Sequence, residues 1–105
     1  MNADGPGPAA LADDVRAALR AVIDPELGFN IVDLGMVYDI AVGPDGAVRV
    51  LMTTTTRFCP ASAFLQEAVN ERAAAVPGVR AVAVELTYDP PWGPDLMTPE
   101  VSAQF

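Results

Sequence analysis

The sequence predicts a two-layer α/β domain in the order α-β-β-α-β, in which two helices cover one face of a three-stranded mixed sheet. Three observations support this fold class. Two segments carry apolar residues at helical spacing, three carry them in alternation, and a turn at Gly43–Gly46 joins the first two alternating runs. A chain of 105 residues should form a single domain that buries roughly two-thirds of its unfolded surface.

Glycine and proline are frequent in residues 1–10, so this stretch is expected to be a disordered lead-in, and the domain is expected to occupy residues 11–105. A first helix is predicted from Leu11 to Ile23. It ends there because Asp24 precedes Pro25, and a residue before proline avoids helical backbone angles. Its apolar stripe consists of Leu11, Val15, Ala18, Leu19, Val22 and Ile23.

Residues 36–42 and 47–54 are predicted to form an antiparallel hairpin, because the turn between them has proline followed by Asp-Gly. On the first strand, Tyr38, Ile40 and Val42 are expected to share one face. On the second strand, the alternating apolar residues are Val48, Val50 and Met52.

The second helix has an apolar stripe that consists of Phe64, Leu65, Ala68, Val69 and Val76, and Pro77-Gly78 ends it. A third strand is predicted over residues 79–88, with a buried set that consists of Val82, Val84 and Leu86. Because a helix connects the second and third strands, the crossover should be right-handed and these two strands parallel.

The segment from Asp89 to Pro94 is too rich in proline to join the interior of a sheet. The tail up to Phe105 is expected to be irregular, or to form at most one helical turn over residues 99–103. One sheet face is left without a helix, and its expected cover is either the tail that contains Trp92 or a second subunit.

The charge of the chain excludes several classes of partner. The net charge is −8, from six arginines, no lysine and fourteen acidic residues. Without a cationic footprint, neither nucleic acid nor an anionic membrane surface is an expected partner. No apolar run approaches the ~18 residues of a membrane span. A single cysteine cannot form an internal disulfide, so the expected location is cytoplasmic.

The chain has no histidine, which removes the Ser-His-Asp triad, the Cys-His dyad and every metal site that uses histidine. The protein is therefore not expected to be an enzyme of these kinds.

The stretch from Met52 to Ala61 contains the only cysteine and is the main candidate site. Pro60 suits the first turn of the second helix, so Cys59 is expected at its N-cap, with the sulfur at the positive end of the helix dipole. This position and the nearby Arg57 should lower the pKa of the thiol. The alternative is a structural cysteine that is simply buried. The threonines of residues 53–56 are either a β-branched strand end or donors to the thiolate.

Acidic and aromatic residues are further candidates, each with a structural alternative. Asp24 and Glu26 flank Pro25 and are either solvated loop acids, which the sequence alone favours, or a carboxylate pair directed at Cys59. Asp33 could equally cap a local turn. Trp92 is either a packing lid or, with its prolines, a docking surface for a partner.

A metal site with one cysteine per chain is limited by ligand number. Iron–sulfur clusters usually need about four thiolates, and this chain supplies one. Two chains around a twofold axis would supply two, so any bound cluster should be shared or transient, and a homodimer is one way to share it.

Four segments together resemble a known family. They are Asp24–Gly28, Asn30–Tyr38, Met52–Thr56 with Cys59-Pro60, and Tyr88–Trp92. In this order they resemble the small MIP-type iron–sulfur assembly domain that SufT, PaaD and the eukaryotic cytosolic cluster-targeting protein share. The resemblance extends from about Leu11 to Met97, almost the whole ordered chain.

The resemblance implies a two-layer α/β fold, a role in the maturation of iron–sulfur proteins, and assembly proteins and client apoproteins as partners. It implies a site formed by Asp24, Glu26, Thr55, Thr56 and Cys59, with Asp33 as a neighbour. Cys59 would be the metal ligand, for iron or a transient iron–sulfur cluster. Where the family has Thr-Thr-Pro-Gly-Cys-Pro, Arg57 and Phe58 replace the proline and glycine. The chain lacks the C-terminal cysteines of PaaD-like members and so resembles the SufT type.

Three hypotheses of function follow. The first is an accessory factor that delivers iron or a cluster to client apoproteins through Cys59. The second is a metal-free adaptor that docks clients through Pro90-Pro91-Trp92 and the open sheet face. The third is a thiol-dependent enzyme with Asp24 or Glu26 as base, which is disfavoured because a carboxylate is a poor match to the pKa of a thiol.

Overall fold

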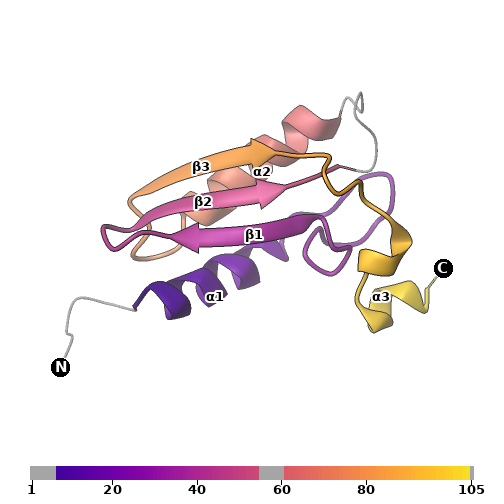
Figure 1. Ribbon diagram of the computed structural model, residues 1–105, viewed down its shortest axis with the longest axis horizontal. Helices are drawn as coiled ribbons and strands as arrows, with labels where there is room; N and C mark the ends of the chain where they lie inside the picture. Colours follow the sequence, from indigo (N-terminus) through magenta and orange to yellow (C-terminus); the bar gives the residue numbers. More distant parts are fainter. Residues whose placement is uncertain (1–6, 55–60, 105) are drawn as a thin grey trace.

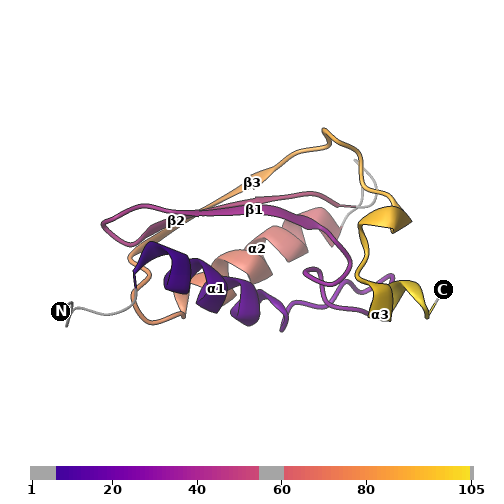
Figure 2. The same cartoon turned by 60° about the horizontal axis from the view of Figure 1, so that its bottom comes forward.

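A computed structural model describes residues 7–54 and 61–104 of the chain, and the statements below refer to these residues. A three-stranded sheet in the order β1-β2-β3 forms one layer, and the two long helices form the other, on one face of the sheet (Figures 1 and 2). The elements are α1 (Pro8–Leu19), β1 (Val37–Val42), β2 (Ala47–Met52), α2 (Ala61–Ala74), β3 (Ala81–Leu86), η1 (Pro94–Leu96) and α3 (Pro99–Ser102). The predicted fold class and element order are confirmed.

Helix α1 lies earlier in the chain than predicted. It begins at Pro8, three residues before the predicted start, because proline fits the first helical turn. It ends at Leu19, so the predicted extension to Ile23 is wrong. The backbone after α1 pairs with a later loop instead of continuing the helix, because the Val22 carbonyl accepts a hydrogen bond from the N–H of Ile31 at 3.0 Å. Ile23 is 47% exposed and bridges to Asn30.

The sheet has the predicted directions, with β1 antiparallel and β3 parallel to β2. A register shift between Val37 and Asp39 places Val37 opposite Met52. Val37 is buried at this irregularity, and Tyr38, which was expected to share a face with Ile40 and Val42, is half-buried. The hydroxyl of Tyr38 donates a hydrogen bond to the carbonyl of Pro90 at 2.8 Å.

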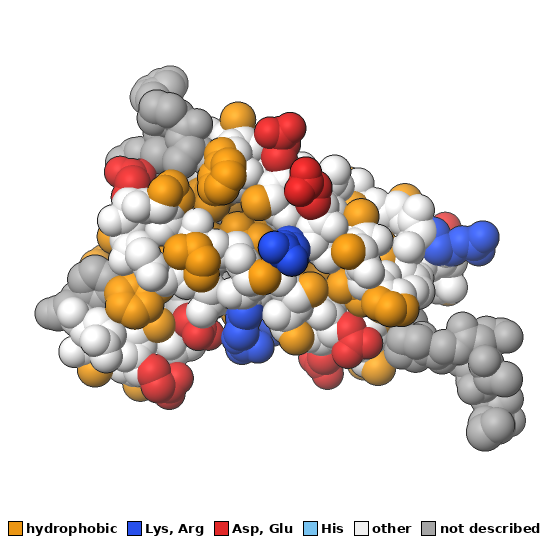
Figure 3. Space-filling model, turned by 180° about the vertical axis from the view of Figure 1, so that it is seen from behind, with side chains coloured by type: hydrophobic (Ala, Val, Ile, Leu, Met, Phe, Trp, Pro, Cys, Tyr) orange, Lys and Arg blue, Asp and Glu red, His pale blue; other side chains and the backbone are white. Residues whose placement is uncertain are grey.

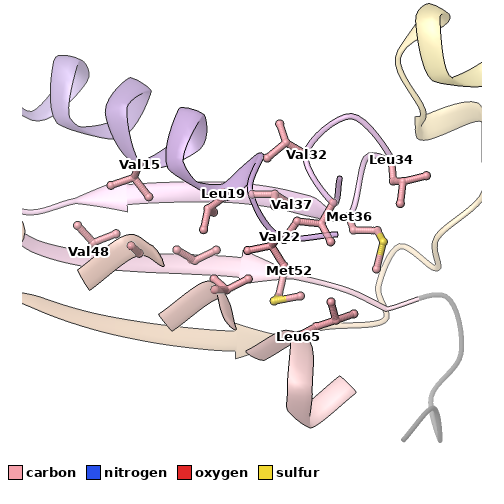
Figure 4. Packing of buried hydrophobic residues seen from close by; sticks show 14 of the residues in the cluster. Val15, Leu19, Val22, Val32, Leu34, Met36, Val37, Val48, Met52 and Leu65 are labelled. Atoms are coloured by element: carbon pink, nitrogen blue, oxygen red, sulfur yellow. The ribbon is translucent and has the colours of Figure 1, made fainter. Parts of the chain in front are cut away.

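The core lies between the helices and β2, whose residues Val48, Val50 and Met52 are buried as predicted (Figure 4). The helices contribute a set of buried side chains that consists of Leu11, Val15, Leu19, Leu65, Val69 and Ala73. Phe64 does not belong to this set and is 56% exposed. The buried positions of α2 follow Leu65 at intervals of four residues, and Phe64 lies about 100° away around the helix.

Strand β3 is less buried than predicted. Its helix-side residues Val82, Val84 and Leu86 are only half-buried, because β3 is an edge strand. The opposite face of the sheet carries exposed Ala41, Arg49, Ala83 and Glu85. Arg49 and Glu85 form an ion pair at 3.1 Å across this face.

The C-terminal tail packs at the end of the sheet, beside the turn of residues 31–35, and leaves the open sheet face uncovered (Figure 2). The prediction that the tail covers this face is therefore wrong. The N–H of Thr98 donates to the carbonyl of Asp33 at 2.8 Å, and Val101 is buried. The single helical turn that was allowed for residues 99–103 is present as α3.

Candidate functional site

The segment that contains Cys59 connects β2 to α2. Cys59, Thr55, Thr56, Arg57 and Phe58 lie outside the described residues, so their predicted roles remain predictions. Both ends of the connection are described: Thr54 on one side and Ala61, the first residue of α2, on the other. These two residues bound the candidate site on either side of Cys59.

The strand end before Cys59 is held from both neighbouring strands. Thr53 and Thr54 are buried, with 0% and 2% of their surfaces exposed. On the β1 side, the N–H of Thr53 donates a hydrogen bond at 2.9 Å to the carbonyl of Met36, the residue before β1. On the β3 side, the hydroxyls of Thr54 and Tyr88 are 2.8 Å apart and form a hydrogen bond. These contacts hold Thr53 and Thr54 in place after the end of β2.

Asp24 is a buried loop residue, so its interpretation as a solvated acid is wrong. Only 2% of its surface is exposed. Its Oδ1 accepts hydrogen bonds from the backbone N–H groups of Glu26 at 2.8 Å and Leu27 at 2.9 Å. Its backbone carbonyl accepts from Gly28 at 2.8 Å, so one residue organises the whole turn.

Glu26 is exposed on the same turn, two residues after Asp24. The two acids that were predicted as a pair thus have different environments, one inside the loop and one at its surface. A role for either as co-ligand of Cys59 remains a prediction, because Cys59 lies outside the residues that are described.

Asn30, rather than Asp33, caps the local turn, so the interpretation of Asp33 as the cap is wrong. Oδ1 of Asn30 accepts a hydrogen bond from the N–H of Asp33 at 2.9 Å, and Nδ2 of Asn30 donates to Oδ2 of Asp33 at 2.9 Å. Arg20, just after α1, reaches Oδ1 of Asp33 at 3.4 Å. Asp33 therefore links the end of α1 to the turn on which the tail packs.

Trp92 is a packing lid, in agreement with the structural alternative. Its indole N–H donates to the carbonyl of Leu34 at 2.8 Å, and its half-buried ring packs against the hydrophobic core. Its exposed neighbours Pro90 and Pro91 continue the surface of the tail. The tryptophan itself is thus engaged within the domain.

Sequence reasoning missed two apolar side chains that border this end of the molecule. Ile23 and Phe64 were both predicted to be core residues, and both line an open hollow of about 270 Å³ between α2 and the segment that follows α1. Ile23 precedes the Asp24 turn, and Phe64 lies in the first turn of α2. The Asp-Pro stop directly after Ile23 was a signal that this residue leaves the helix.

The described part of the chain has neither a cluster of acidic side chains for a metal ion nor a membrane-spanning helix. Within residues 7–54 and 61–104, no three aspartate or glutamate side chains gather closely enough to hold a metal ion. None of the helices in these same ranges is both long enough and apolar enough to cross a bilayer.

Comparison with known proteins defines the class. A crystal structure of a domain of unknown function, DUF59, from Bacillus anthracis is similar to this chain with a TM-score of 0.89 and 33% identity, over 92% of both chains. Residues 12–86 match the family described as iron–sulfur cluster assembly protein, and the chain belongs to this family. The family that the four segments predicted is thereby confirmed.

Two curated relatives carry specific names. An Fe-S protein maturation auxiliary factor from Porphyromonas gingivalis is 43% identical over 93 residues, which cover 89% of each chain. An iron-sulfur cluster carrier protein from Mycobacterium bovis is 47% identical over 72 residues, which are 69% of this chain but 19% of that protein. The similarity to the carrier thus concerns a small part of its length.

Proposed function

We propose that this protein is an accessory factor in the maturation of iron–sulfur proteins, which passes iron or an iron–sulfur cluster to client apoproteins with the thiolate of Cys59 as a ligand. Membership of the iron–sulfur cluster assembly family supports the general role. The names of the relatives, a maturation auxiliary factor and a cluster carrier, support delivery of a cluster as cargo.

One observation carries the proposal: the only cysteine of the chain lies in the short connection between the buried end of β2 and the start of α2. Buried Thr53 and Thr54 hold one end, and α2 begins at the other. The fold thus defines both ends of the connection, and the proposal places the cargo ligand between them.

The chemistry of one thiolate favours transfer over storage. Clusters are usually held by about four cysteines and this chain supplies one, so about three thiolate ligands must come from another chain or from the client. A cluster with exchangeable ligands can pass to an apoprotein that supplies a complete set. Carboxylates such as Asp24 and Glu26 are harder ligands and would complete the shell weakly.

The proposal is tested by anaerobic reconstitution with ferrous iron and sulfide, followed by visible absorbance. Cys59→Ala should lose the sulfide-to-iron absorbance of the wild type. Asp13→Asn, a change of an exposed acid in α1, is the matched control and should keep it. Equal absorbance from Cys59→Ala and the wild type would show that the thiolate is not a ligand.

A metal-free adaptor is the second candidate, and the uncovered sheet face favours it. The part of this hypothesis that relied on Trp92 is weakened, because the indole is bonded to Leu34. Ala41 lies on the open face and is exposed, so Ala41→Arg should abolish capture of apo-ferredoxin on immobilised protein if this face docks clients. Under the first proposal, Ala41→Arg leaves capture intact and Cys59→Ala reduces transfer of cluster.

A further inference from the structure

The outer edge of β3 has no strand beside it among the described residues. In the sheet order β1-β2-β3, this strand pairs only with β2. An edge strand presents the N–H and C=O groups of alternate residues to a further strand. The six residues of β3, Ala81–Leu86, contain no proline and only one charged residue, so nothing in their sequence blocks such pairing.

A groove runs along this edge between β3 and α2. It has a volume of about 430 Å³ and is lined by Ala63, Gln66, Glu67, Asn70, Val82 and Val84. Val82 and Val84 are half-buried, so the floor of the groove is apolar and remains partly open to solvent. Figure 3, which views the helix side of the molecule, shows acidic side chains beside hydrophobic ones in its upper part.

Carboxylates flank the edge on both faces of the sheet. Glu67 of α2 borders the groove on the helix side. On the open face, Glu85 of β3 is half-exposed even though it pairs with Arg49. The sign of these charges selects against a second copy, because each chain carries a net charge of −8.

We propose that the β3 edge and the adjoining groove bind an extended, basic segment of a partner protein by strand addition. Backbone hydrogen bonds to β3 provide the pairing. Alternate apolar side chains of the segment lie over Val82 and Val84 in the groove, and the intervening basic side chains lie near Glu85 on the other face. This surface goes beyond the proposed cargo chemistry, because it does not require Cys59.

The test uses the capped peptide Arg-Val-Arg-Val-Arg-Val in an NMR titration of the full chain. Its binding should shift the amide signals of β3 and of α2 from Ala63 to Asn70, and should protect alternate β3 amides from hydrogen exchange. The peptide Glu-Val-Glu-Val-Glu-Val should not bind. Shifts located elsewhere, or equal binding of the acidic peptide, would overturn the proposal.

Two further comparisons distinguish strand addition from loose contact. N-methylation of the peptide on one set of alternate residues should abolish binding, and on the other set should leave it unchanged, because only one edge of the peptide meets β3. Glu85→Lys should weaken binding about fivefold, as expected for loss of a surface charge contact. Glu100→Lys, which makes the same charge change on α3, is the control and should have a smaller effect.

Three further results of the peptide experiments bear on strand addition to β3. Equal binding of both N-methylated peptides would exclude strand addition. Concentration-dependent self-association that protects β3 amides without peptide would assign the edge to a second copy instead. Cys59→Ala should bind the peptide as the wild type does, so loss of cluster binding and loss of this surface can be told apart.

Discussion

Asp24 holds the loop between α1 and β1, and its removal should lower the free energy of unfolding. Asp24→Ala leaves the N–H groups of Glu26 and Leu27 without their acceptor. We expect a loss of about 1–3 kcal/mol, measured by urea denaturation. Asp24→Asn keeps an oxygen at the same position and should lose less.

The same pair of variants separates a structural role from a ligand role. If Asp24 contributes only to the loop, Asp24→Asn should bind iron as the wild type does. A folded Asp24→Asn protein with reduced iron binding would instead support the predicted carboxylate ligand. Equal destabilisation by alanine and asparagine would contradict the hydrogen-bonding account.

The sequence showed which helix residues are apolar, but not always which of them point into the core. The stripe positions Leu11, Val15 and Leu19 are buried as predicted. Ile23 and Phe64 are not, because an apolar side chain next to a stripe cannot be assigned to core or surface from spacing alone. The burial of Asp24 was equally inaccessible, since it depends on how the turn after α1 folds back.

The tail packs against the turn before β1, and Gly35 of this turn lies against Leu96 of η1. Its φ is +78°, and a Cβ atom there would overlap the backbone of Leu96 in η1. Gly35→Ala should therefore cost about 1–2 kcal/mol for the backbone angle and about 1–3 kcal/mol more for the overlap. Fluorescence of Trp92, the only tryptophan, reports displacement of the tail.

Gly28 provides the matched control. Its φ is also +78°, but nothing lies within 4 Å of an added Cβ. Gly28→Ala should therefore show only the cost of the backbone angle and an unchanged Trp92 spectrum. Equal stabilities of the two variants would mean that the tail does not press on Gly35.

Elements that depend on neighbours in sequence were predictable, and the tail was not. The hairpin follows from four turn residues, Gly43–Gly46, and the crossover follows from the handedness of such connections. The Trp92–Leu34 hydrogen bond joins residues 58 positions apart, and no local pattern announces it. For the same reason, the sequence could not show which part of the domain the tail covers.

At the scale of the whole molecule, three surfaces lie on different sides of one small sheet. The helices cover one face, the other face is open, and the tail and the ends of the Cys59 connection lie at one end (Figure 1). The β3 edge and the Cys59 connection belong to different strands, because that connection follows β2 and not β3. Docking at the edge and transfer through Cys59 are therefore proposals that can be tested separately.

The ligand count of the whole chain gives a prediction about assembly. Because each chain has one cysteine, reconstitution should yield no more than one cluster per two chains, and the loaded protein should sediment as a dimer or larger species under anaerobic conditions. Removal of the cluster by a chelator should return the smaller species. Two chains of net charge −8 repel each other, so added salt should favour the loaded dimer. One cluster per chain in a sedimenting monomer would show that ligands other than Cys59 complete the shell within a single chain.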